Sequence, residues 1–344
     1  MPAGPYGSLV AADAMNAPYP MTGAPVTIVD FPPDGVRQAS ANMMGGPNML
    51  PTSASMIVPA SEYPDYVDAQ VYCEGDPYPH RTLFDPSPSG GWGWQVLPEG
   101  LIYHSYQAGV RESRTSLVWF GESDGRNLWD ATLGGRAGLV RFGNYDALRP
   151  QGWQLDIEGA ALVRLNLEAD SDLDSADFRF GVPLTYGVGD WQFKLAYYHL
   201  SAHMGDEFAI RNPGSLTTRI NYVRDAMVLG ASYYVVPAMR VYSEVAYATN
   251  NDGGAEPWEL QFGTELSRPG PTGPRGTPFL AINTHLRQEH DFGGDFASQV
   301  GWLWRGLEGQ TMRAGVHYFN GKSSQYQTFD ESEQQIGGGL WYDF

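Results

Sequence analysis

The sequence contains very little cysteine or lysine. Its 344 residues include one cysteine, Cys73, and two lysines, Lys194 and Lys322. A lone cysteine excludes an internal disulfide and a cysteine cluster for zinc. So few lysines, in a chain of net charge −18, offer no basic patch for phosphates, and we expect no nucleic-acid partner.

Long apolar runs are also missing. No stretch approaches the roughly 18 to 20 apolar residues of a transmembrane helix, so the chain can cross a bilayer only as a closed barrel of strands. Residues 1–30 carry neither the basic start nor the apolar stretch of a signal peptide, and we expect any export signal to lie outside the given sequence. A soluble protein of two packed sheets is the alternative that this leaves open.

Proline divides the chain into two parts. Of the 25 prolines, 15 fall in residues 1–95, among small and polar residues with almost no apolar periodicity. This composition predicts a low-complexity N-terminal segment that is largely disordered or extended. Residues 96–344 form the second part, in which glycine and aromatic residues alternate with polar ones.

The second part shows the period-2 pattern of strands with one apolar and one polar face. The odd positions of residues 153–168 are apolar or small, from Trp153 to Leu167, whereas most even positions are polar or charged. We predict an all-β fold, a transmembrane antiparallel up-and-down β-barrel of about 12 strands. The expected strands lie near residues 107–121, 127–143, 153–168, 176–186, 190–203, 219–236, 238–249, 258–266, 278–288, 296–306 and 310–320 and in the C-terminal run.

The C-terminal run resembles the insertion signal of bacterial outer-membrane barrels, a terminal Phe preceded by apolar residues at alternate positions. Phe344 is the last residue, and Tyr342, Leu340, Gly338 and Ile336 share its predicted face. The resemblance implies that the barrel-assembly machinery recognises this strand, and it implies a bacterial outer-membrane location.

Charged residues fall on the opposite, inward face of the predicted strands. Their mixed signs predict paired charges that fill the interior, and the alternative is a selective pore. The residues expected there are Asp156, Glu158, Arg164, Arg179, Arg240, Glu244, Glu259, Glu265, Arg287, Arg313 and Glu333.

Polar residues interrupt the outward face of the strand near residues 190–203. The period places His199, Ser201 and His203 outward, near the end of the strand. Two residues apart on one face, His199 can accept the hydroxyl proton of Ser201, and Asn221 on the following strand can orient the imidazole. Ser201, His199 and Asn221 are therefore candidate catalytic residues. A hydrogen-bonded patch that anchors the loop is the alternative.

The residues that follow this strand suggest a metal site. Asp206 and Glu207 carry the oxygen ligands that Ca²⁺ prefers, and His203 lies beside them in sequence. These three are the candidate metal ligands. A zinc site at His199 and His203 and a solvated acidic loop are the alternatives.

The pattern of His199 and Ser201, with Asn221 on the next strand, resembles the His/Ser/Asn site of the outer-membrane phospholipase A family. The resemblance implies a twelve-stranded barrel that hydrolyses outer-membrane lipid as a calcium-dependent homodimer. In that family Asn and Gly follow the serine, whereas Ala202 and His203 follow Ser201 here.

A second resemblance covers about residues 95–344. The stretches YYHLSAHMGDE and RINYVRDAMVLGASYY are similar to domain of unknown function family 1207, a family of outer-membrane barrel proteins. It implies the barrel but no activity. We expect an outer-membrane barrel with a phospholipase A-like surface site for lipid acyl hydrolysis, the alternative being a non-catalytic structural or pore-forming barrel.

Overall fold

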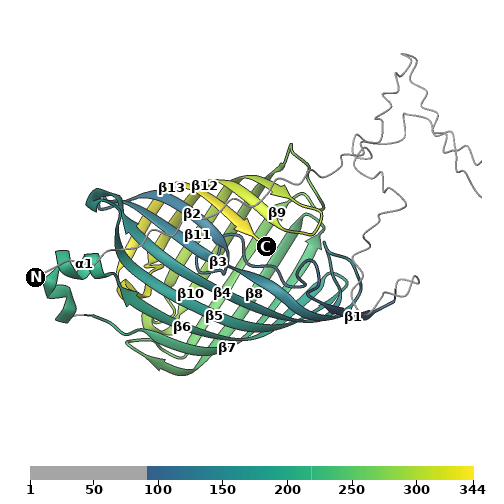
Figure 1. The fold of residues 1–344 in the computed structure, drawn as a ribbon, viewed down its shortest axis with the longest axis horizontal. Coiled ribbons are helices and arrows are strands. Elements are labelled where there is room, and N and C mark those ends of the chain that lie inside the picture. Colours follow the sequence, from purple (N-terminus) through teal and green to yellow (C-terminus); the bar gives the residue numbers. More distant parts are fainter. Residues whose placement is uncertain (1–90, 218) are drawn as a thin grey trace, which may run out of the picture. The chain divides into compact units, whose positions relative to one another are not determined.

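The computed structural model describes residues 91–217 and 219–344, so the predicted N-terminal segment lies outside the described residues apart from 91–95. The described chain forms a closed antiparallel barrel of twelve strands, β2 to β13, with one short additional strand, β1 (Figure 1). This confirms the predicted fold class and strand number. Within 91–217 and 219–344, no helix is long and apolar enough to cross a membrane.

Each strand of the barrel pairs with its neighbours in sequence, and β13 pairs with β2 to close the ring. The strand bounds are β1 Gly93–Val96, β2 Thr115–Glu122, β3 Asn127–Gly143, β4 Gly152–Asn166, β5 Asp172–Val188, β6 Trp191–Met204, β7 Val223–Val236, β8 Met239–Asp252, β9 Trp258–Ser267, β10 Thr277–Arg287, β11 Gly294–Arg305, β12 Thr311–Lys322 and β13 Ser332–Asp343. Most of them reach the roughly 9 to 11 residues that a tilted strand needs to span hydrocarbon.

The two faces of the wall differ in the way that the period-2 pattern predicts. In β4 the outward Trp153, Leu155 and Ile157 are exposed, whereas the inward Asp156 and Glu158 are buried. The same alternation exposes Ile336, Leu340 and Phe344 at the C-terminal end. An exposed apolar belt around a polar interior is the pattern of a transmembrane barrel.

Paired charges fill the interior, as the sequence predicts. Each of the eleven residues expected on the inward face lies inside the barrel, and most of them form ion pairs with a residue on another strand. The pairs include Arg164–Glu333 at 2.6 Å, Lys194–Glu244 at 2.6 Å, Arg179–Glu158 at 3.2 Å, Arg224–Glu259 at 3.3 Å and Arg240–Glu265 at 3.4 Å. Pairing reduces the cost of burying these charges.

Residues 97–114 occupy the interior instead of extending the first strand. The sequence predicts a strand over residues 107–121, but β2 begins only at Thr115, and the prediction is wrong at this end. Tyr103 and Tyr106 are fully buried, and the ring of Tyr106 stacks on Tyr242 with centroids 3.8 Å apart. The mispredicted residues 107–114 include the buried polar side chains Gln107, Arg111 and Arg114, which suit the barrel interior as well as they suit the inward face of a strand, and for this reason the pattern misleads.

This interior segment, residues 97–114, is bonded to strands on several sides of the barrel. The Tyr106 hydroxyl donates to Glu244 at 2.6 Å, and the backbone N–H of Gln107 donates to Glu265 at 2.7 Å. Arg111 donates to Asp177 at 3.0 Å, and its guanidinium lies 3.6 Å from the ring centroid of Tyr326 in the inward-folded β12–β13 connection. The interior is therefore filled by backbone as well as by side chains.

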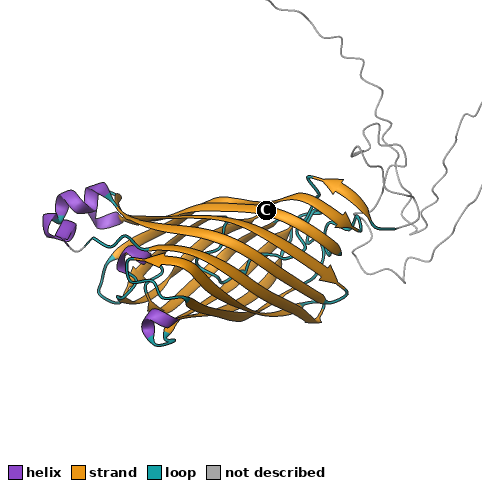
Figure 2. Cartoon of the chain, turned by 90° about the horizontal axis from the view of Figure 1, so that it is seen from below, coloured by secondary structure: helices purple, strands orange, loops and turns teal. Residues whose placement is uncertain are grey.

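The two ends of the barrel differ in their connections. All the helices within residues 91–217 and 219–344 lie at one end (Figure 2). They are η2 Leu167–Ala169, α1 Asp206–Arg211, η3 Pro213–Thr217, η4 Gln288–His290 and η5 Tyr326–Thr328. The other end carries the tight β5–β6 and β7–β8 turns together with two longer connections, 144–151 and 268–276. We call these the helix-bearing end and the turn end.

Arg111→Ala removes one partner of the buried Arg111–Asp177 ion pair and leaves a carboxylate of 0% exposure without its cation. We expect the free energy of unfolding, measured by denaturant titration of the refolded barrel, to fall by about 3 to 5 kcal/mol. Arg149→Ala is the matched control, because Arg149 and its partner Asp190 are 34% and 55% exposed and pair at 3.5 Å, and such pairs contribute about 1 kcal/mol or less. Equal losses in the two variants would contradict the assigned role of Arg111.

Candidate functional site

The outward face of β6 changes character along its length. Trp191, Phe193 and Leu195 are exposed apolar residues, and the same face continues through Tyr197 to His199, Ser201 and His203 near the helix-bearing end. The intervening residues Tyr198, Leu200 and Ala202 point inward and are buried. The predicted outward position of the two histidines and the serine agrees with this alternation.

His199 is held by a carboxylate of the next strand. The β6–β7 register places His199 opposite Asp225, and His199 Nδ1 lies 2.7 Å from Asp225 Oδ1. A carboxylate accepts, so Nδ1–H donates and Nε2 is left as the acceptor in the neutral ring. The Tyr197 hydroxyl (2.8 Å) and the Asn250 amide (2.9 Å) also donate to Asp225 and fix its position.

The hydroxyl of Ser201 has an imidazole partner on its other side. Ser201 Oγ lies 3.3 Å from His203 Nε2, two residues farther along the same face. The ring of Phe178 on β5 packs edge-on against His203, with centroids 5.5 Å apart. The structure therefore brings Ser201 together with His203, the residue that the sequence suggested as a metal ligand, and brings His199 together with Asp225.

Asn221, the predicted orienting residue, is not brought to this pair. The β6–β7 ladder ends at the pair Ser201–Val223, and Asn221 lies exposed two residues before β7 begins. The structure describes no hydrogen bond from Asn221 to His199 or Ser201. Asp225 holds the imidazole instead. In the sequence, Asp225 is a lone acidic residue on the otherwise apolar outward face of residues 223–236. Its partner, His199, could be identified only from the strand register.

The predicted metal ligands do not form a cluster. Asp206 and Glu207 are exposed in the first turn of α1, and within the described part of the chain no three His, Cys, Asp or Glu side chains are close enough to hold a metal ion. At the other end of the helix, Arg211 pairs with Asp174 at 2.7 Å. Calcium binding by Asp206, Glu207 and His203 stays a prediction.

The arrangement can carry out proton transfer at a serine. His203 supplies a hydrogen-bond partner for the hydroxyl, and His199 supplies an imidazole oriented by a carboxylate. Each histidine thus has one of the two contacts that a general base uses in nucleophilic catalysis. His199 is 43% exposed and Asp225 is 21% exposed, so a substrate on the outer surface of the barrel can reach them.

A comparison with known families gives a match that covers most of the chain. A family described as "Protein of unknown function (DUF1207)" matches residues 93–344. No curated protein matches the sequence.

Three solved structures with a similar backbone are distant in sequence. Outer membrane phospholipase A from Escherichia coli is 12% identical, with a TM-score of 0.44 over 69% of this chain and 96% of that one. The Salmonella typhi outer membrane phospholipase dimer with bound calcium is 11% identical, with a TM-score of 0.44 over 67% and 91%. A mutant porin of Rh. blastica is 9% identical, with a TM-score of 0.26 over 67% and 98%. At these identities no residue's role is transferred.

Cysteine labelling tests the outward position of the site. In a Cys73→Ser background, we expect Ser201→Cys to react with a maleimide in detergent, because its side chain lies on the outer surface. Ala202→Cys is the matched control, since Ala202 is 1% exposed and faces the interior. Equal labelling of the two positions would contradict the register of β6.

Proposed function

Because the chain belongs to the DUF1207 family, whose description names no activity, we propose its function from its own geometry: it is an outer-membrane β-barrel with a serine acyl-hydrolase site for membrane lipid on its outer surface. The observation that carries this proposal is the outward row of His199, Ser201 and His203, in which the serine has an imidazole partner and the second imidazole is bonded to Asp225.

The chemistry of the wall supports an outer-membrane location. A belt of exposed tryptophan, phenylalanine, leucine and valine side chains faces outward from a closed ring with a charged interior, and such a belt is stable in lipid. Aromatic pairs such as Trp153–Tyr186 and Trp191–Tyr233, 4.5 and 4.6 Å between centroids, lie on this face near the turn end, as in an interfacial girdle. The outward Phe344 and Leu340 support recognition of β13 by the barrel-assembly machinery.

The position of the site suits an ester at the lipid interface. Ser201 lies between the apolar part of β6 and the polar connections of the helix-bearing end. Acyl chains of a bound lipid pack against Phe178, Phe180 and Leu195, and the ester reaches Ser201. A polar cluster on a lipid-facing wall is costly unless it has a function or partners, and here it has both hydrogen bonds and access.

The reaction we propose has two steps. Ser201 Oγ attacks the ester carbonyl carbon while His203 Nε2 takes the hydroxyl proton, and that proton then passes to the departing glycerol oxygen, which leaves an acyl-serine. Water attacks the acyl-serine, gives its proton to an imidazole and releases the fatty acid, and Ser201 regains a proton. The Asp225-bonded His199 is the second imidazole beside Ser201, with its Nε2 available as acceptor.

Calcium and a homodimer belong to the same proposal. The Salmonella structure is a dimer with bound calcium, and the candidate ligands in this chain are Asp206, Glu207 and His203, the last through Nδ1 because its Nε2 takes the hydroxyl proton. Fatty-acid release is therefore to be measured with and without calcium. Sedimentation in both conditions reports whether two chains associate.

A non-catalytic structural barrel is the second candidate, and the filled interior favours it over an open pore. The interior segment and the buried Ser323, Ser324, Gln325 and Tyr326 of the β12–β13 connection occupy the space that a channel needs. Such a barrel releases no fatty acid, and this separates the two candidates.

We expect the refolded protein to release fatty acid from phospholipid in detergent, and Ser201→Ala to reduce the rate by more than about 10³-fold, because it removes the nucleophile. Ser116→Ala is the matched control, a serine-to-alanine change on β2 away from the site. Heat-dependent mobility on gels checks that each variant is folded. No release from the starting protein, or equal release from Ser201→Ala, would leave the structural barrel.

The imidazoles and their partners are distinguished by a second set of variants. We expect His203→Asn to reduce the rate by roughly 10²- to 10⁴-fold as the general base. Asp225→Asn should reduce it as well, since His199 loses its carboxylate, whereas Asn221→Ala should leave it unchanged. A large loss in His199→Asn with none in His203→Asn would transfer the role of base to His199.

A further inference from the structure

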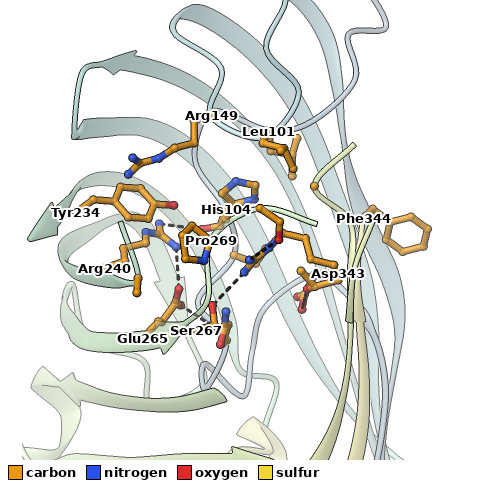
Figure 3. A pocket seen from close by; sticks show the side chains of 18 of the residues that line it. Leu101, His104, Arg149, Tyr234, Arg240, Glu265, Ser267, Pro269, Asp343 and Phe344 are labelled. Atoms are coloured by element: carbon orange, nitrogen blue, oxygen red, sulfur yellow. Dashed lines mark hydrogen bonds and ion pairs between the residues drawn. The ribbon is translucent and has the colours of Figure 1, made fainter. Parts of the chain in front are cut away.

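A cavity of about 100 Å³ opens at the turn end, whereas Ser201 lies near the helix-bearing end. Its walls come from the interior segment, the β7–β8 turn, the β3–β4, β9–β10 and β11–β12 connections, and the C-terminus (Figure 3). Neither the proposed hydrolysis nor the family description assigns it a role.

The charge of the cavity walls is opposite to that of the protein. Four arginines and two carboxylates line the cavity, although the chain as a whole has a net charge of −18. They are Arg136, Arg149, Arg240, Arg305, Glu265 and Asp343. Both carboxylates already have cationic partners, since Glu265 pairs with Arg240 at 3.4 Å and Asp343 pairs with Arg313 at 2.9 Å.

Arg305 has no such partner among residues 91–217 and 219–344. Its guanidinium donates to Ser267 Oγ at 3.0 Å and to the carbonyl oxygens of Arg268 and Gly270, and no described carboxylate lies within 4.0 Å of it. These neutral acceptors hold the group in place but leave its charge uncompensated. A partly buried charge of this kind is stabilised by an anion.

Arg149 is positioned at the rim of the same cavity. Its guanidinium lies 3.8 Å from the ring centroid of Tyr234, and its one described ion pair, with Asp190, is long at 3.5 Å. The buried Nη2 atom of Arg149 and the Nε atom of Arg240 have no hydrogen-bond partner in the described part of the chain. Figure 3 shows Arg149, Tyr234, Arg240 and His104 around the cavity.

The arginines of the cavity also affect the pKa of His104, in the interior segment. Burial lowers its pKa to about 3, and the positive charges of Arg240, Arg305 and Arg136 contribute to the lowering. The imidazole is therefore neutral at ordinary pH and adds no positive charge of its own. The three arginine charges, unlike the burial, favour an anion in the space beside His104.

We propose that this cavity binds the phosphate group of a small solute or of a lipid headgroup, with Arg305 and Arg149 as its main contacts. Arginine forks bind phosphate oxygens through paired hydrogen bonds, and unpartnered guanidinium nitrogens are available from Arg149 and Arg240. The volume accommodates one phosphate group but not a lipid, so any larger ligand extends out of the mouth along Tyr234.

The test is calorimetric titration of the refolded full-length protein in a detergent without phosphate groups, with inorganic phosphate as the probe. We expect saturable binding that Arg305→Gln and Arg149→Gln each weaken by roughly tenfold or more, the loss of one charge-assisted contact. Arg126→Gln, at the opposite end of the barrel, is the matched control and should bind as the starting protein does. Arg305→Lys keeps the charge and should retain part of the affinity.

Each outcome decides the proposal. Absence of saturable phosphate binding, or unchanged binding in Arg149→Gln, would overturn it. Arg149 lies partly exposed in a connection, so this variant is informative even where Arg305→Gln fails to fold. Glycerol phosphate competing with inorganic phosphate indicates a headgroup or phosphorylated solute as the source, and a failure to compete indicates the free ion. Binding that survives in Ser201→Ala shows that the cavity acts independently of the proposed hydrolase site.

Discussion

The pairing of β13 with β2 is the interaction on which the rest of the structure depends. It turns an open meander of twelve strands into a ring in which the backbone hydrogen bonds of the wall are made within the wall. Closure then places alternate residues of every strand in two different surroundings, outside and inside the ring. The outer face becomes an apolar surface, and the inner face becomes a crowded polar interior in which charges must find partners.

The fold was accessible from the sequence because both of these demands leave a period-2 pattern. Residues 153–168 alternate so regularly that the strand, its two faces and its inward charges were all predicted, and β4 confirms them. The start of β2 was not accessible. Gln107, Arg111 and Arg114 are polar residues of the kind that the inward face of a strand also carries, and only the three-dimensional ring distinguishes a segment within the barrel from a segment of its wall.

The candidate site, too, was predictable from the sequence only in part. The outward row of His199, Ser201 and His203 follows from the period of one strand, and the sequence was sufficient for it. Their partners depend on the register between strands and on side-chain torsions. The register brings Asp225, not Asn221, to His199, and Ser201 turns toward His203. A motif within one strand is local information, whereas the group that orients it comes from a neighbour 26 residues away.

The interior segment has a consequence for assembly. Its contacts join residues far apart in the chain, with separations of 66 for Arg111–Asp177, 138 for Tyr106–Glu244 and 206 for Gln107–Arg313. Arg114 of the same segment pairs with Asp343 of the last strand, β13, at 3.1 Å, so the segment gains its full stabilisation only when β13 has joined the ring. The interior segment at the start of the described chain therefore stabilises the closed ring once the C-terminal strands are in place. This makes barrel formation more cooperative and places the slowest, most non-local step last.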